Sequence, residues 1–390
     1  MWIYLLLFII PVVWYLSGLA GDDSRVLAVF MAGLALFVGL SDMLGGYDRY
    51  IYGEIFDSFA NVTTWGGSYA ASGVFRMISP VEVGWGGLNI VLSWFTANRY
   101  IFILAVTLIT YTCLFVSLRR YAVNYPFALI LFLGLWFFFT FTYLRQVLAA
   151  SVAWLAIPYI IKRKFWKFLP LALITMSLHK SGIIFFPMYF FATHRYQKRT
   201  LFIVVIVTVL IGLTPLPNYL FQTYGDVTNV VHSDYSSMGS MRVEYLLEAV
   251  FFLFFLFRLY DTFDQDRTTV VMVNLAFMFC LTLVFFIRSD NGGRLAWYYI
   301  IGIICLFSAI GSPENKVSFR AFGPLLVIVS FALFFRIVVA WGALVNPYKS
   351  FLTNGVRPND RICKQYEYDT RYSQDKMYRI PFRLKVNIRQ

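Results

Sequence analysis

Residues 100–118 read YIFILAVTLITYTCLFVSL, and this stretch contains no charged residue. An α-helix rises 1.5 Å per residue, so a run of about 20 apolar residues can cross the hydrocarbon core of a bilayer. The apolar residues follow one another without the alternation of a barrel strand, and a helix satisfies its own backbone groups in lipid. The stretch therefore predicts a membrane-spanning helix, which Arg119 and Arg120 follow directly.

The chain repeats this pattern up to residue 345, which predicts an all-α integral membrane protein with about twelve transmembrane helices. Segment 83–97 is rich in glycine and contains Asn89, so we expect an interfacial or re-entrant helix there rather than a span. Residues 346–390 form a basic tail after the membrane domain 1–345. The apolar runs lie at about 2–20, 26–41, 100–118, 126–143, 146–161, 166–178, 181–193, 200–213, 244–260, 268–287, 295–310 and 321–345.

The composition excludes several classes of protein. Of the 390 residues 59% are hydrophobic and 14% are charged, whereas a soluble protein carries roughly 25% charged residues on its surface. The net charge of +13 fits basic cytoplasmic loops beside anionic lipid better than nucleic acid, because no basic stripe is interleaved with aromatic residues. The four cysteines are scattered and the three histidines lie far apart, so we expect neither a metal site nor a cofactor.

The lysines and arginines between the runs predict the orientation of the chain. If the first span runs from outside to inside, the inner connections hold fourteen of them and the outer connections eight. Such an excess on the cytoplasmic side is typical of membrane proteins. The long outer segments are then 42–99 and 214–243, and long loops of this kind are commonly functional. The tail 346–390 also falls outside, where its positive charge is unexpected.

Ionisable residues beside apolar runs are costly and indicate function, and nearly all of them fall on the outer side in this layout. Arg145 opens the run 146–161. It is either an anchor that snorkels to the interface or a guanidinium that binds phosphate oxygens. His179 joins two apolar runs, as a structural histidine or as an acid or base near neutral pH. Arg336 lies within a span and should face a cavity or a partner carboxylate.

Two further groups of polar residues lie in the outer connections. Arg288 and Arg294 bracket the sequence RSDNGGR, which is either a solvated turn or an anion site, and Tyr298 follows one turn later. Asp48 and Glu82 are flanked by glycine and aromatic residues. They are either solvated loop acids or a pair that orients a sugar hydroxyl and accepts its proton.

Five short elements carry a resemblance to a known family. The chain resembles the EpsG-type, Wzy-like bacterial polysaccharide polymerases, whose recurring elements are G-x-D-x-x-Y, E-P-G, L-R-Q-x-x-A, F/L-H-x-S and R-x-x-x-Y. Two positions depart from these patterns, because the aromatic residue comes one place early at Tyr50 and Val83 replaces the proline. The matching elements, in order, are Gly46-Tyr47-Asp48-Arg49-Tyr50, Glu82-Val83-Gly84, Leu144-Arg145-Gln146-Val147-Leu148-Ala149, Leu178-His179-Lys180-Ser181 and Arg294 through Tyr298.

The resemblance implies a fold similar to the multispan lipid-phosphosugar (GT-C-like) glycosyltransferases, in the bacterial cytoplasmic membrane. It implies a polyprenyl-pyrophosphate-linked oligosaccharide as substrate, for an O-antigen or an exopolysaccharide. The growing chain would move from its lipid pyrophosphate onto a sugar hydroxyl of the incoming unit, and the polyprenyl tail would enter laterally from the membrane lipid. A flippase and a chain-length regulator are the further partners that the resemblance implies.

The implied chemistry gives each candidate residue a role. A leaving pyrophosphate develops negative charge, which fixed cations stabilise. The resemblance therefore implies that three arginines bind the pyrophosphate, that an acid or histidine activates the acceptor hydroxyl, and that tyrosines contact the sugar. These groups are Arg145, Arg288 and Arg294; His179, Asp48 and Glu82; and Tyr50 and Tyr298.

Three other functions remain open on the residues alone. A flippase or other transporter would distribute polar residues through the membrane depth, often with internal repeats, and neither feature occurs here. A membrane O-acyltransferase acting on polysaccharide would pair His179 with a second histidine or asparagine deep in an apolar run, and Asn274 alone is comparably placed. A sugar-to-lipid-A ligase shares the chemistry of the polymerase.

Overall fold

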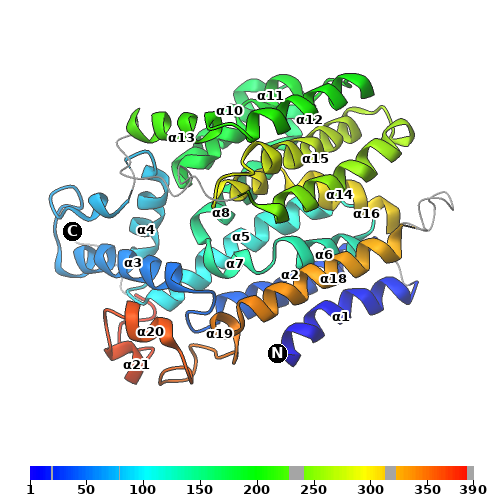
Figure 1. Cartoon of the computed structure of the whole chain (residues 1–390). Helices are drawn as coiled ribbons and strands as arrows, with labels where there is room; N and C mark the ends of the chain where they lie inside the picture. Colours follow the sequence, from blue (N-terminus) through cyan, green and yellow to red (C-terminus); the bar gives the residue numbers. More distant parts are fainter. Residues whose placement is uncertain (19–20, 79, 228–240, 312–321, 384–390) are drawn as a thin grey trace.

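Figure 1 shows the structure, a computed structural model that describes residues 1–18, 21–78, 80–227, 241–311 and 322–383. These residues form helices and loops, and no β-strand occurs among them. Four helical segments are long and apolar enough to cross a membrane, which confirms an all-α membrane fold for the described residues but not the expected twelve spans. They are α5 (Arg99–Tyr121), α8 (Leu144–Leu155) with α9 (Ile157–Ile161), α15 (Arg267–Phe285) and α18 (Gly323–Ala340).

The remaining apolar runs form shorter helices, and two runs are interrupted. Run 126–143 gives α6 (Tyr125–Leu135) and the single turn α7 (Phe139–Thr142). Run 181–193 gives the 3-10 helix η2 (Lys180–Phe185) and, after a proline that has no N–H to donate, α11 (Met188–Phe191). The others are α1 (Trp2–Leu16), α2 (Ser24–Gly39), α4 (Val83–Phe95), α10 (Phe165–Leu178), α12 (Lys198–Gly212), α14 (Val243–Leu259) and α16 (Ile300–Ser308), which follows the 3-10 helix η4 (Gly292–Tyr298).

The two long outer segments contain helices that hydropathy alone does not predict. Segment 42–81 folds into α3 (Tyr47–Trp65) and the short η1 (Val74–Met77). Helix α3 is amphipathic, and it buries Tyr52, Ile55, Phe56 and Phe59. Segment 214–243 begins with α13 (Leu216–Val227), and residues 228–240 lie outside the described residues.

The helices run back and forth, so the polar connections gather at the two ends of the bundle. We call one of them the site end: there α3, α5, α8 and α14 begin and α10 and α15 end. Hydrogen bonds join these connections across the bundle. The amide of Lys180 donates to Glu82 at 3.1 Å, Gln146 donates to the carbonyl of Arg294 at 3.1 Å, and the amide of Arg242 donates to the carbonyl of Ile287 at 2.8 Å.

The tail folds onto the site end. Helices α20 (Arg361–Tyr366) and α21 (Arg371–Gln374) lie beside α3 (Figure 1). Lys349 and Lys376 each lie 3.0 Å from the carboxylate of Asp42, and Arg379 lies 3.5 Å from that of Asp57. Part of the positive charge of the tail, which the sequence leaves unexplained, is therefore balanced by Asp42 and Asp57 of segment 42–81.

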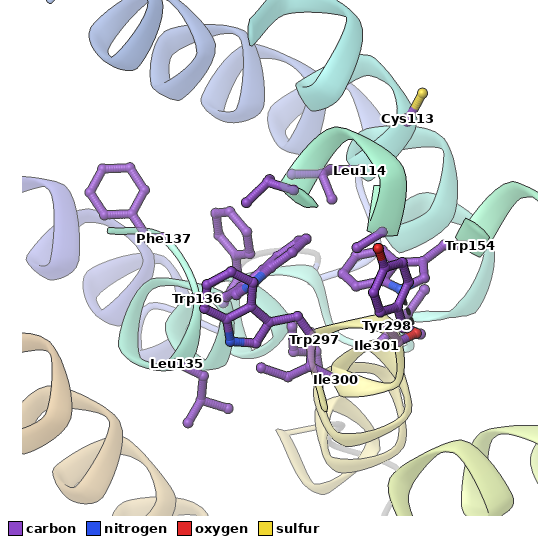
Figure 2. Packing of buried hydrophobic residues seen from close by; sticks show 14 of the residues in the cluster. Cys113, Leu114, Leu135, Trp136, Phe137, Trp154, Trp297, Tyr298, Ile300 and Ile301 are labelled. Carbon is purple, nitrogen blue, oxygen red and sulfur yellow. Dashed lines mark hydrogen bonds between the residues drawn. The ribbon is translucent and has the colours of Figure 1, made fainter. Parts of the chain in front are cut away.

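An aromatic core lies beneath the site end (Figure 2). The ring centroids of Trp136 and Trp154 lie 4.9 Å apart, and those of Trp136 and Trp297 lie 6.5 Å apart. The indole of Trp154 donates to the carbonyl of Tyr298 at 3.0 Å. A buried indole needs such an acceptor, and this bond ties η4 to α8.

Close helix packing gives one prediction about stability. On α16, a Cβ at Gly302 would lie 2.4 Å from the backbone nitrogen of Ala276 on α15, so the two helices meet at this glycine. We expect Gly302→Val to destabilise the protein by about 1–3 kcal/mol through overpacking. The measurement is thermal unfolding of the purified protein in detergent. Gly33→Val on α2, with no atom within 4 Å of the added Cβ, is the control, and equal losses in both variants would contradict the prediction.

Candidate functional site

Four elements bring polar side chains together at the site end. Glu82 lies at the residue before α4, Arg145 in the first turn of α8, His179 between α10 and η2, and Arg294 within η4. Each residue lies at the end of a helical segment, where the connections turn. We call this group, with the residues bonded to it, the polar centre.

The firmest contact of the polar centre is an ion pair. Nη1 of Arg145 lies 2.6 Å from Oε2 of Glu82, and Oε1 of Glu82 accepts the backbone N–H of Lys180 at 3.1 Å. The guanidinium carbon also lies 5.3 Å from the ring centroid of Tyr52, within the range of a cation–π contact. The Glu82 side chain is 2% exposed and that of Arg145 24%. The carboxylate is thus buried and holds a partly accessible guanidinium in place.

A chain of hydrogen bonds runs beside this ion pair. The amide N–H of Ser181 donates to Nδ1 of His179 at 3.2 Å, and the Ser181 hydroxyl lies 2.7 Å from the same nitrogen. The hydroxyl of Tyr298 lies 2.9 Å from that of Ser181. Because Nδ1 accepts, the proton of the neutral ring sits on Nε2. The other ring edge of His179 is therefore a hydrogen-bond donor.

The surroundings of His179 keep it neutral. Burial lowers the pKa of His179 well below its usual value of about 6.5, and the positive charges of Arg145, Lys180 and Arg294 lower it further. The ring is consequently uncharged at neutral pH. In this tautomer it can donate a hydrogen bond to a substrate oxygen but does not offer a basic nitrogen.

Arg294 is held on the other flank of this chain of hydrogen bonds. Its Nη2 donates to the hydroxyl of Tyr143 at 3.0 Å, and its guanidinium carbon lies 4.0 Å from the centroid of the same ring. Gln146 bonds to the carbonyl of Arg294 and lies 3.4 Å from the hydroxyl of Ser181. Two arginines and one lysine thus surround a neutral histidine, which is an arrangement suited to an anion.

The structure separates two candidates from this group. The hydroxyl of Tyr50 donates to the carboxylate of Asp360 at 3.2 Å, so this hydroxyl binds the tail rather than the polar centre. Arg288 donates to the carbonyl of Leu213 at 3.1 Å, and among the described residues this bond leads away from the polar centre. Asp48, in the first turn of α3, acts electrostatically on Arg145.

Several members of the polar centre are absent from the sequence-based candidates. Gln146 and Ser181 lie next to Arg145 and His179 in the motifs, so their position was a usable signal. Tyr52 lies one helical turn after Asp48, and this spacing becomes informative once α3 is known to be a helix. Nothing in the sequence marks Tyr143 as a site residue except its position two residues before Arg145. Among the described residues, no three His, Cys, Asp or Glu side chains come together as metal ligands.

A cavity of about 370 Å³ lies beside the polar centre, since Arg294 and Tyr143 line it. Its other walls come from α6, α7, α14, α15 and the region around Trp341, at the end of α18. A volume of this size lies within the range of about 300–1,000 Å³ of pockets for small ligands.

The fold and the polar centre define a class: a helical membrane protein with a cation-rich site at one end of its bundle. The chain belongs to the EpsG family, whose model matches residues 25–350. This match confirms the family resemblance, and it indicates a membrane polymerase of polysaccharide biosynthesis that acts on a lipid-linked oligosaccharide. Neither the search of curated proteins nor the search of solved structures found a match.

Proposed function

We propose that the chain polymerises oligosaccharide repeat units that are linked through pyrophosphate to a polyprenol, on the outer face of the bacterial cytoplasmic membrane. The observation that carries the proposal is the ion pair of Arg145 with buried Glu82, next to His179 and Arg294. The outer position follows from the basic clusters 162–167 and 195–199, which lie in connections at the opposite end of the bundle.

In the proposed reaction, the oxygen of an acceptor hydroxyl forms a bond to C1 of the donor sugar. The bond between C1 and the pyrophosphate oxygen breaks, and the pyrophosphate leaves with the electron pair. Arg145 and Arg294 stabilise the negative charge that develops there. Nε2–H of His179 donates a hydrogen bond to an oxygen of the substrate. The proton of the hydroxyl goes to a carboxylate of the site, Asp48 or Glu82, because His179 in its tautomer offers no basic nitrogen.

One rival function loses support from the position of Asn274. Its amide donates to the carbonyls of Ala192 and His194 at 2.7 and 2.8 Å, in the connection that follows α11. An acyltransferase would need this residue beside His179, at the start of η2. A transporter is disfavoured because the named polar groups collect at one end of the bundle rather than through its depth.

Deletion of the gene tests the proposal. We expect the surface polysaccharide, examined on a gel, to lose its long polymer and to keep single repeat units. Accumulation of intermediates on the cytoplasmic face would point instead to a flippase. Polymer of unaltered length that lacks only acetyl groups would point to an acyltransferase, and either result would overturn the proposal.

A further inference from the structure

The cavity beside Arg294 has walls of unusual composition. Six aromatic residues line it, together with the ion pair of Arg242 and Asp290, whose atoms Nη2 and Oδ1 lie 2.5 Å apart. The hydroxyl of Tyr245 also donates to the carbonyl of Asp290 at 3.3 Å. The aromatic residues are Phe139, Tyr143, Tyr245, Phe279, Trp297 and Trp341.

One carboxylate in this cavity has no role in the polar centre. Glu248 lies on α14, half-buried, and it makes no hydrogen bond or ion pair with the other described residues. Arg336 of α18 attracts it electrostatically, but the guanidinium of Arg336 lies 3.3 Å from Glu244, one helical turn earlier. A carboxylate between membrane helices is costly unless hydrogen-bond donors reach it. The walls of the cavity thus leave an acceptor for a ligand to satisfy.

The mixture of charges restricts the chemistry of that ligand. A phosphate would be repelled by Glu248 and Asp290, and an organic cation by Arg242 and Arg294. A neutral ligand with many hydroxyl groups satisfies both kinds of side chain, because a hydroxyl donates to a carboxylate and accepts from a guanidinium. Flat aromatic walls supply the apolar contact that the faces of a sugar ring need.

We propose that this cavity is a saccharide subsite, in which Glu248 accepts hydrogen bonds from sugar hydroxyls and the aromatic walls contact the ring faces. The volume of about 370 Å³ admits a short oligosaccharide segment rather than a polymer. Because Arg294 and Tyr143 belong to both sites, a saccharide bound here lies next to the pyrophosphate position. The assignment of this saccharide to the lipid-linked repeat unit rests on the proposed function.

Binding of oligosaccharide to the purified protein tests the subsite. The probe is a set of short fragments released by partial acid hydrolysis of the surface polysaccharide of the host, and the measurement is calorimetry in detergent. We expect Glu248→Ala to weaken binding by about 10- to 100-fold, the effect of losing hydrogen bonds to a charged group. Glu248→Gln, which keeps the shape and one acceptor, should weaken it less. Leu247→Ala, an exposed neighbour on the same helix that does not line the cavity, is the control and should bind within about two-fold of wild type.

Two outcomes would overturn the proposal. It is overturned if Glu248→Ala binds the fragments as wild type does, or if wild type binds none. Thermal unfolding of each variant separates lost binding from lost folding. As a second measurement, the same fragments should slow alkylation of Glu248→Cys, since the four native cysteines are buried.

The proposed function and the subsite can fail separately. If gene deletion leaves long polymer in place while binding still depends on Glu248, the subsite stands and the polymerase proposal falls. If deletion removes the polymer but Glu248→Ala binds normally, the polymerase proposal stands and the subsite falls.

Discussion

Cells that carry Arg145→Ala should make single repeat units and no long polymer, even when expression is adjusted so that the variant reaches the wild-type level in the membrane. In the proposed reaction the guanidinium stabilises charge that develops only as the pyrophosphate leaves. Removing one such donor from a water-excluded site costs about 10²–10³-fold in rate. The measurement is the length distribution of surface polysaccharide on a gel, with the protein quantified by immunoblot.

Arg145→Lys separates geometry from charge. A lysine keeps the positive charge but loses the planar fork that binds phosphate oxygens in pairs, so we expect little recovery of polymer. Arg76→Ala is the matched control, because Arg76 is an exposed arginine of η1 in the same outer segment as Glu82. Long polymer in Arg145→Ala cells would remove this residue from the mechanism.

Arg145→Ala also affects stability, and a second substitution can separate this effect from the effect on catalysis. Glu82 is buried, and without Arg145 its carboxylate loses its ion-pair partner, which destabilises a fold by about 3–5 kcal/mol. The double variant Arg145→Ala with Glu82→Gln leaves no buried charge at this position. We expect this variant to be more stable than Arg145→Ala and equally inactive. Recovery of polymer in the double variant would show that the single change acts through folding.

The sequence predicts the members of the polar centre better than their contacts. Arg145, His179 and Arg294 each lie where an apolar run begins or ends, and alternating helix directions place these positions on one side. Nothing in the local pattern indicates that Glu82 bonds to Arg145 or that Ser181 fixes the tautomer of His179. Such contacts depend on how the helices pack. Which residues of separate apolar runs bond to each other is therefore determined only in the folded structure.

Two features of segment 42–81 could not be predicted from the sequence, for the same reason. Tyr50 looks like a substrate residue because it stands in a loop motif, yet its hydroxyl bonds to Asp360, 310 residues later. Segment 42–81 looks like a loop because it is polar, yet α3 forms there by burying one apolar face. In both cases the residues that contact this segment belong to the tail or to a neighbouring helix. They lie far away in the sequence, so a short stretch of sequence does not include them. The match to the family ends at residue 350, so Asp360 and most of the tail lie beyond it.

A second large effect, on the free energy of unfolding, is expected where the tail contacts the start of α5. Nη2 of Arg99 lies 2.5 and 2.6 Å from the two carboxylate oxygens of Glu367, and Nη1 lies 3.7 Å from Asp57. The guanidinium carbon also lies 4.0 Å from the ring centroid of Tyr372. The side chain of Arg99 is 1% exposed and that of Glu367 5%. Arg99→Ala would leave two buried carboxylates without this cation, and we expect a loss of about 3–5 kcal/mol.

Thermal unfolding in detergent measures this loss, and trypsin cleavage within 346–383 reports release of the tail. Arg371→Ala is the control in the same tail. Its ion pair with Asp369 is largely exposed, since the Arg371 side chain is 68% exposed, so the variant should lose no more than about 1 kcal/mol. If Arg99→Ala and Arg371→Ala unfold at the same temperature with equal protection of the tail, the buried network does not hold the tail.

The pH dependence of the defect follows from Asp57. Burial raises the pKa of Asp57 to about 6, although Arg99 and Arg379 pull it down. An acid whose pKa is raised in the folded state stabilises the fold while it is protonated, and this contribution is lost as pH rises through the folded pKa. Without Arg99 the folded pKa of Asp57 rises further, so the added penalty appears above about pH 6. The difference between the unfolding temperatures of wild type and Arg99→Ala should therefore narrow between pH 7.5 and about 5. A difference that stays constant or widens on acidification would show that Asp57 does not contribute to the defect, which would then come from the contacts of Arg99 with Glu367 and Tyr372.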